Sequence, residues 1–226
     1  MKFKYKKMIV MITMGTMLIG CVIFSTVSPN KDKSTSTKTV ATQESEQVSP
    51  TPTQSPDVDT TVVQKDLNTE VSQVVQNYLI ASVACDMDAL EDTVNDISMI
   101  SEEELKLKYE FVESVNNIEC YMIPGPNGDG YLVYAYRELK LKDIETLAPG
   151  LSRVYVKTGD NGEYRVFFGA DTGLEDFINT TDQSAEVTEL VNKVNTKMEE
   201  AVSSDKDLKT FIEKITVSDK ANTKAK

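Results

Sequence analysis

An uncharged apolar run, Met8 to Val27, lies close to the start of the chain. A helix rises about 1.5 Å per residue, so this run would reach about 30 Å, the thickness of the hydrocarbon core of a bilayer. Four lysines precede the run, and basic residues stay on the cytoplasmic side of a membrane anchor. The pattern therefore predicts an anchor in residues 1–27, with everything after it on the extracytoplasmic side of the cell membrane.

Two kinds of anchor fit these residues. Leu18-Ile19-Gly20-Cys21 has the form of a lipobox, in which a signal peptidase cuts before the cysteine and lipid is attached to Cys21. Val22 to Phe24 continue the apolar run past this cysteine, as in an uncleaved single-pass signal anchor. A weak cleavage site near Thr26 and Ser28 leaves release of the domain as a third alternative. All three place the following residues outside the cytoplasm.

Residues 28–65 have the composition of a disordered linker. They are rich in Ser, Thr, Pro and Gln, and no aromatic residue occurs between Phe24 and Tyr78. Such a segment cannot bury enough apolar surface to offset the entropy lost on ordering. About 160 residues remain after it, which is enough for one domain with its own core and hardly enough for two.

Apolar positions after the linker take helical spacing three times. The first predicted helix runs from about Asp66 to Ala84, and a shorter one from Asp88 to Asn95. The third opens at Ser101-Glu102-Glu103-Glu104, a capping box in which the Ser101 hydroxyl accepts from the Glu104 amide. We expect this third helix to end at about Val115.

Strand patterns come next, rich in aromatic and β-branched residues and separated by turns of Gly, Pro and Asn. The four predicted strands are Ile118–Ile123, Tyr131–Leu141, Arg153–Lys157 and Tyr164–Phe168. Ala148-Pro149-Gly150 is expected to break the chain before the third of them. The order predicts an antiparallel meander of four strands after the three helices, and hence an α+β fold.

Helical spacing returns after the strands, from Val187 to Val202 with Ser184 or Asp182 as N-cap, and again from Leu208 to Ile215. Residues 171–216 are therefore predicted to be a helical extension that packs against the domain. Residues 217–226 read as a polar tail.

The order of these elements, together with several short motifs, resembles a known family over about residues 66–170. The motifs are Tyr131-Leu132-Val133-Tyr134-Ala135-Tyr136, Asp143-Ile144-Glu145-Thr146, Ala148-Pro149-Gly150-Leu151, Val154-Tyr155-Val156 and Asn161-Gly162-Glu163-Tyr164. They resemble the exported NTF2-like (cystatin-like cone) domains of clostridia and their relatives. The resemblance implies a curved sheet wrapped around a long first helix, with a cone-shaped cavity between them. In that superfamily the cone serves enzymes, ligand binders and assembly modules alike, so the fold leaves the function open.

Charge excludes some ligands. The chain has 24 basic and 36 acidic residues, and without the four leader lysines the outward part holds 20 against 36, a net charge of −16. Such a surface repels nucleic acid and anionic lipid headgroups. We therefore expect no nucleic-acid partner, and contact with the membrane only through the N-terminal anchor.

No catalytic or metal-binding template fits the sequence. The chain has no histidine, so the usual general base for a serine or cysteine nucleophile is missing. The acidic cluster Asp86, Asp88, Glu91 and Asp92 lacks the glycine that an EF-hand loop needs for its turn, and these residues read as helix caps and a solvated face. We expect no enzyme activity, no metal and no cofactor.

Cysteines and tyrosines supply the remaining candidate residues. Cys85 and Cys120 could pair outside the cytoplasm, closing a loop worth about 3–4 kcal/mol, although two buried free thiols fit the sequence equally well. Tyr131, Tyr134, Tyr136 and Tyr155 are candidates for a pocket or an interaction surface, since tyrosine offers area and a hydroxyl. Alternation places Tyr134 and Tyr136 on one face of the strand and Tyr131 on the other.

These observations together predict a membrane-tethered, non-enzymatic NTF2-like module of the cell envelope. We expect it to work by self-association or by binding an envelope protein. The alternative is a cone domain that binds a small molecule or a glycan fragment, or an enzyme that uses a buried acid, although no Asp or Glu stands out as that acid.

Overall fold

The computed structural model describes residues 63–159, 161–169 and 172–224. The predicted anchor, Cys21 and the predicted linker up to residue 62 lie outside the described residues. Among the residues that are described, no helix is both long and apolar enough to cross a bilayer. The chain is a mixed α+β protein, as the sequence predicts.

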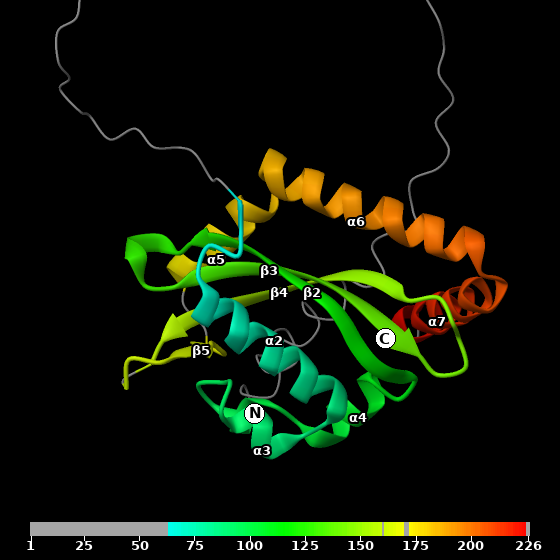
Figure 1. The fold of residues 1–226 in the computed structure, drawn as a ribbon, viewed down its shortest axis with the longest axis horizontal. Coiled ribbons are helices and arrows are strands. Elements are labelled where there is room, and N and C mark those ends of the chain that lie inside the picture. Colours follow the sequence, from blue (N-terminus) through cyan, green and yellow to red (C-terminus); the bar gives the residue numbers. More distant parts are fainter. Residues whose placement is uncertain (1–62, 160, 170–171, 225–226) are drawn as a thin grey trace, which may run out of the picture. The chain divides into compact units, whose positions relative to one another are not determined.

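The centre of the fold is an antiparallel sheet of five strands in the order β1-β2-β3-β4-β5, so that each strand pairs with its neighbour along the chain (Figure 1). The strands are β1 (Gln64–Lys65), β2 (Val112–Pro124), β3 (Tyr131–Leu141), β4 (Ala148–Thr158) and β5 (Tyr164–Val166). The predicted meander is confirmed, with the short β1 added at the edge of β2.

Helices lie on both faces of the sheet (Figure 1). The described α-helices are α2 (Thr69–Ala84), α3 (Met87–Glu91), α4 (Glu102–Lys108), α5 (Thr172–Asp182), α6 (Ala185–Ser204) and α7 (Lys206–Lys224). A short 3-10 helix, η2 (Ile97–Met99), separates α3 from α4, and another, η3 (Pro126–Gly128), forms the turn between β2 and β3.

Local sequence fixes both ends of α2. The Asn68 side chain accepts hydrogen bonds from the amides of Glu70 and Val71, so it satisfies two of the free donors at the helix start. The helix ends at Cys85, which takes a left-handed conformation (φ 54°) and donates its amide back to Ser82. The observed helix agrees with the predicted one except in its first turn.

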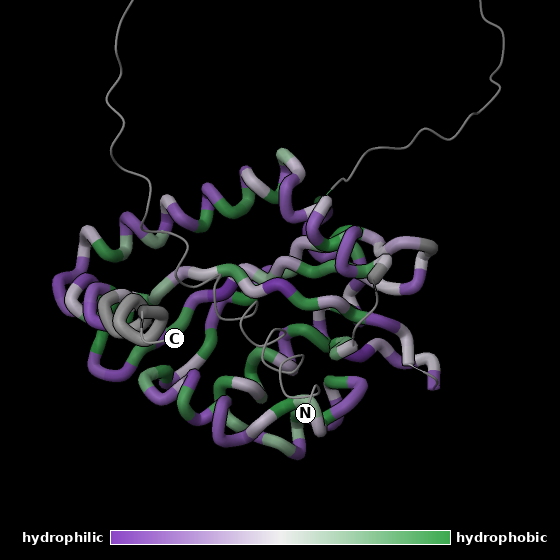
Figure 2. Tube along the Cα trace, turned by 180° about the vertical axis from the view of Figure 1, so that it is seen from behind, coloured by the Kyte–Doolittle hydropathy of each residue, from purple (hydrophilic) through white to green (hydrophobic). Residues whose placement is uncertain are grey.

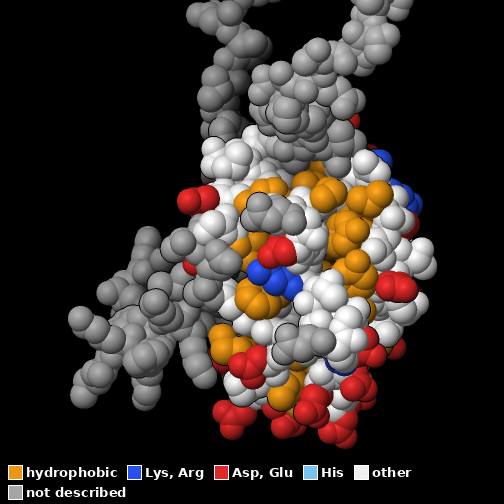
Figure 3. Space-filling view, turned by 90° about the vertical axis from the view of Figure 1, so that its left-hand side faces the viewer, with side chains coloured by type: hydrophobic (Ala, Val, Ile, Leu, Met, Phe, Trp, Pro, Cys, Tyr) orange, Lys and Arg blue, Asp and Glu red, His pale blue; other side chains and the backbone are white. Residues whose placement is uncertain are grey.

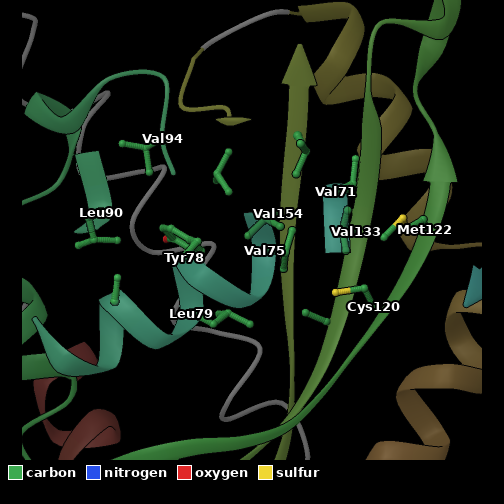
Figure 4. Packing of buried hydrophobic residues seen from close by; sticks show 14 of the residues in the cluster. Val71, Val75, Tyr78, Leu79, Leu90, Val94, Cys120, Met122, Val133 and Val154 are labelled. Atoms are coloured by element: carbon green, nitrogen blue, oxygen red, sulfur yellow. The ribbon is translucent and has the colours of Figure 1, made fainter. Parts of the chain in front are cut away.

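Between α2 and the sheet lies the first part of the core. Val71 and Val75 of α2 pack there with Cys120, Val133 and Val154 of the sheet (Figure 4). The residues of this cluster on β3, at positions 133 and 135, share one side of the strand because strand side chains alternate.

Helices α5 and α6 cover the opposite face of the sheet. Leu174 of α5 and Val187, Leu190 and Val194 of α6 pack on the side chains of β3 and β4 that point away from α2. Figure 2 shows the hydrophobic turns of α6 toward the sheet and its hydrophilic turns outward. The prediction that the C-terminal helices pack on the domain is therefore confirmed. Ser184, one of the two predicted N-caps, is the N-cap of α6.

An ion pair fixes α5 to the sheet beside this apolar contact. Tyr134 of β3 donates its hydroxyl to Asp182 Oδ1 at 2.6 Å, and Arg153 of β4 pairs with the other carboxylate oxygen. The three side chains come from three different elements, so this cluster sets where α5 meets the sheet. Helix α5 lies within residues 171–216, which were predicted to be a helical extension, although no helix with these bounds was predicted.

Several predicted boundaries are wrong. The second helix ends at Glu91 instead of Asn95. The third helix ends at Lys108 instead of Val115, and β2 begins at Val112 instead of Ile118. Ala148-Pro149-Gly150 does not break the chain but opens β4, where Ala148, Pro149 and Gly150 pair with β3. The early starts of β2 and β4 have the same cause. Both strands pair with the eleven-residue strand β3, whose backbone donors and acceptors hold its neighbours in strand conformation over most of its length.

Candidate functional site

The four candidate tyrosines do not form one surface. Tyr134, Tyr136 and Tyr155 lie on the face that α5 and α6 cover, and their exposed fractions are only 0%, 5% and 5%. Tyr131 packs on the opposite face, with its ring edge-on to that of Tyr164 at 6.0 Å. The predicted alternation is confirmed, and three of the four tyrosines serve the core beneath the C-terminal helices.

The hydroxyl groups of two of these tyrosines reach polar partners at the margins of the core. Tyr155 donates to Asp129 Oδ1 at 2.8 Å, and Tyr136 accepts from Lys197 of α6 at 3.2 Å. Burial raises the pKa of Tyr136 above its ordinary value and that of Tyr134 to about 12. These hydroxyls therefore stay protonated at neutral pH and act as fixed donors or acceptors.

The sheet end that carries the β2–β3 and β4–β5 turns shows hydrophobic side chains gathered around a basic and an acidic group (Figure 3). At this end Lys157 Nζ lies 3.0 Å from Asp129 Oδ2 and 4.7 Å from the centre of the Phe167 ring. The ammonium is held by an opposite charge and a ring face. Both charges are thus already paired, which makes this cluster a structural contact.

Side chains occupy the space in which the family resemblance implies a cavity. Val71, Val75, Cys120, Met122 and Val133 lie between α2 and the sheet with no exposed surface (Figure 4). No Asp or Glu is buried among the described residues. The buried acid that a cone enzyme without histidine would need is therefore not present in this part of the chain.

One buried charge does lie in the sheet, and it is basic. Arg137 of β3 is only 3% exposed, and its alternation with Val133 and Ala135 places it on the α2 side. Its Nε–H donates to Ser152 Oγ of β4 at 2.9 Å, while Nη1 is buried with no hydrogen-bond partner. Burial lowers the pKa of the guanidinium from its ordinary value, yet arginine remains charged in proteins.

Two side chains that carry hydroxyl groups interact with this guanidinium, Ser152 and Tyr109. Tyr109, which follows α4, lies near enough to interact electrostatically with both Arg137 and Tyr78. The Ser82 hydroxyl lies beside that of Tyr78 but is buried without a well-formed hydrogen bond. Ser82 Oγ and Arg137 Nη1 are the two buried side-chain atoms that lack partners in the described part of the chain.

The sequence analysis did not single out Arg137, although a signal was present. Arg137 alternates with Val133 and Ala135, so it lies on the same face of the strand as they do. This strand is apolar on both faces in Tyr131-Leu132-Val133-Tyr134-Ala135-Tyr136. An arginine in phase with a core face is either at a strand end or buried with a specific partner. Tyr131–Leu141 continues past it, which makes the second case the expected one.

A hollow of about 600 Å³ lies at the outer surface between the start of α2 and the β4–β5 turn. Glu70, Asp92 and Glu163 contribute to its wall, but Glu163 is paired with Arg165, whose guanidinium also donates to the Asp92 carbonyl. No group of three or more metal-ligating side chains occurs among the described residues. This hollow therefore offers no free charge cluster of its own.

The acidic cluster and the cysteines have local roles. Asp86 is the N-cap of α3, accepting from the Ala89 amide at 3.0 Å, as the sequence suggests. Cys85 and Cys120 are free thiols, the first at the end of α2 and the second buried in β2. The possible disulfide is not formed in this structure, and burial raises the pKa of Cys120 to about 11.

No protein-family model matches the chain, and neither the curated proteins nor the solved structures contain a significant match to it.

Proposed function

We propose that this chain is a membrane-tethered, extracytoplasmic module of the cell envelope that works by contacting protein and not by catalysis. The basic residues before an uncharged apolar run and the long polar linker support the tether. The order of helices and strands, with the long helix α2 packed across an antiparallel sheet, supports the NTF2-like type of fold.

The observation that carries the contact proposal is the placement of the exposed large hydrophobic residues. In the described chain, all of these residues precede β2, in the part of the sequence that forms α2, α3 and α4. They are Leu67, Ile80, Leu107 and Phe111, with exposed fractions of 41%, 52%, 73% and 51%. The α5–α6 side has none, because its apolar residues are used against the sheet.

Leu107 and Phe111 stand out within this set because they lie four residues apart, at the end of α4 and directly after it. Phe111 also meets Phe211 of α7 edge-on at 5.7 Å, so the apolar surface continues onto a second element. Covering apolar surface stabilises a complex by about 25 cal/mol per Å² removed from water. A protein partner, either another envelope protein or a second copy of this chain, gains most by docking here.

Site-specific photo-cross-linking in cells tests the proposal. Benzoylphenylalanine is placed at Leu107 in the full-length chain, and at Lys193 on the exposed side of α6 as the matched control. We expect discrete cross-linked products from position 107 and few or none from position 193. A product of twice the mass of the 25.1 kDa chain identifies self-association, and any other discrete mass identifies a partner for mass spectrometry. No product from position 107, or the same products from both positions, would contradict the proposal.

A further inference from the structure

The hollow between the start of α2 and the β4–β5 turn combines apolar and polar side chains in its wall. Its volume of about 600 Å³ lies in the range of small-molecule sites, about 300–1,000 Å³. Val74 of α2 and Tyr164 of β5 contribute apolar surface, and Asn161 and Glu163 of the turn contribute polar groups. Helix α2 packs on β5, so both parts of the wall belong to one packed unit (Figure 1).

The polar groups of this wall hold one another in place. Asn161 Nδ2 donates to Glu163 Oε2 at 2.6 Å, and Arg165 Nη2 donates to the same oxygen at 2.8 Å. Arg165 Nη1 also donates to the backbone carbonyls of Glu91 and Asp92. The charges of Glu163 and Arg165 are therefore balanced. Because these side chains are already ordered, a ligand that binds them pays little further entropy.

The Tyr164 ring is fixed as well. Its hydroxyl accepts a hydrogen bond from Asn68 Nδ2 at 3.3 Å, and Asn68 is itself held as the N-cap of α2. The ring also meets that of Tyr131 edge-on, with 6.0 Å between the ring centres. The hollow thus presents an aromatic ring in a set orientation beside groups that donate and accept hydrogen bonds.

This combination excludes several classes of ligand. An anion would meet Glu70 and Asp92 in the same wall, in a chain with 36 acidic against 24 basic residues. No group of three or more metal-ligating side chains occurs in the described part of the chain. A wholly apolar molecule would take the polar groups of the wall out of water without giving them new partners. A neutral molecule with several hydroxyl groups and one apolar face meets all of these constraints.

We propose that this hollow binds a neutral saccharide, which goes beyond the proposed contact with protein. Sugar hydroxyls donate and accept hydrogen bonds, so they match a wall of amide and guanidinium donors and carboxylate acceptors. The face of an aromatic ring is negative and attracts the polarised C–H groups on one side of a pyranose ring. Tyr164 supplies such a face, with Val74 beside it. Binding depends most on Tyr164 and Asn161.

Fluorine NMR of the tyrosines tests the site directly. The nine tyrosines of the full-length chain are replaced by 3-fluorotyrosine. The chain is held in a polyoxyethylene detergent, because a detergent with a sugar head group would compete for the site. Tyr164→Phe and Tyr136→Phe each remove one signal and so assign these two residues. Glucose, galactose, mannose and N-acetylglucosamine are then titrated separately.

We expect at least one of these sugars to move the Tyr164 signal along a saturable curve, with a half-maximum at about 0.1–10 mM. The Tyr136 signal, from the opposite face of the sheet, is the internal control and should not move. Asn161→Ala should raise the half-maximum at least about fivefold, the equivalent of one lost hydrogen bond. The matched variant Asn192→Ala, on the exposed side of α6, should leave it unchanged.

An oligosaccharide of the sugar that binds distinguishes two sources of the ligand. A half-maximum at least about tenfold lower per sugar unit than that of the monosaccharide identifies a polymer whose neighbouring units also contact the wall, since additional contacts add binding free energy. Equal values per sugar unit identify the free sugar as the ligand.

A Tyr164 signal that none of the four sugars moves would overturn the proposal, and so would equal half-maxima in the unsubstituted chain and in Asn161→Ala. Choline chloride that moves the Tyr164 signal at the same concentrations as the sugars would identify a cation site instead. None of these results bears on cross-linking at Leu107, so failure of this inference and failure of the proposed function are distinguishable.

Discussion

Arg137 and Arg153 show how much the surroundings decide what one residue type does. Both lie on central strands, and burial lowers the pKa of both guanidiniums. Arg153 meets Asp182 across the face covered by α5 and so joins a helix to the sheet. Arg137 points to the α2 side, where the described residues supply hydroxyls and no acid. The first is a structural contact between a helix and the sheet, whereas the second is a buried charge whose Nη1 has no hydrogen-bond partner.

Two other buried groups make the stability of the domain sensitive to alkaline pH. Burial raises the pKa of the Cys120 thiol from 9.0 to about 11, and that of Tyr134 from 10.0 to about 12. The folded state therefore holds these protons more tightly than the unfolded state, so their contribution is complete below about pH 9 and is lost as the pH rises.

We expect the free energy of unfolding to fall from about pH 9 upward, by about 2 kcal/mol from Cys120 alone once pH 11 is passed. Urea unfolding followed by circular dichroism measures it, because the chain has no tryptophan. Cys120→Ala should lower stability at every pH but flatten the decline between pH 9 and 11. A decline of unchanged slope in this variant would show that Cys120 is not its source.

At the scale of elements, the sequence predicts the bounds of a helix or strand best where the segment shows only one hydrophobic pattern. The strand Tyr131–Leu141 was predicted with its observed bounds, because turns limit it and apolar residues fill both faces. The start of β2 was missed because Val112 follows a helix with a strong cap, and only pairing with β3 reveals the strand. Arg137 was missed for a related reason, since a strand pattern does not say which charges have partners in space.

Helix α6 provides the prediction at this scale. Leu190 is 9% exposed and packs with Val187 and Val194 against the sheet. Leu190→Ala should lower the free energy of unfolding by about 2–4 kcal/mol, because it removes buried methyl groups and leaves a cavity. The exposed neighbour Glu189→Ala is the control and should change stability by less than about 0.5 kcal/mol. Equal small effects in urea unfolding would mean that α6 is not docked on the sheet.

For the whole molecule, the two sides of the sheet have different roles in this account. The α5–α6 side is closed by packing and an ion pair. The α2–α4 side keeps the exposed apolar residues and the unpaired buried arginine. The proposed contact with protein concerns this second side, and it depends on the domain standing outside the cytoplasm on its anchor, which is the central claim.

Labelling of intact cells with a membrane-impermeant maleimide tests that claim most directly. Lys193→Cys places a thiol on the exposed side of α6, and Lys4→Cys places one before the apolar run, with the unsubstituted chain as the background for its own cysteines. The account predicts that Lys193→Cys is labelled in intact cells, that Lys4→Cys is not, and that the chain stays with washed membranes. Labelling of Lys4→Cys after the cells are opened identifies the uncleaved anchor, because cleavage before Cys21 would remove this residue. Labelling of Lys4→Cys but not of Lys193→Cys in intact cells, or a chain that leaves the membranes on washing, would contradict it.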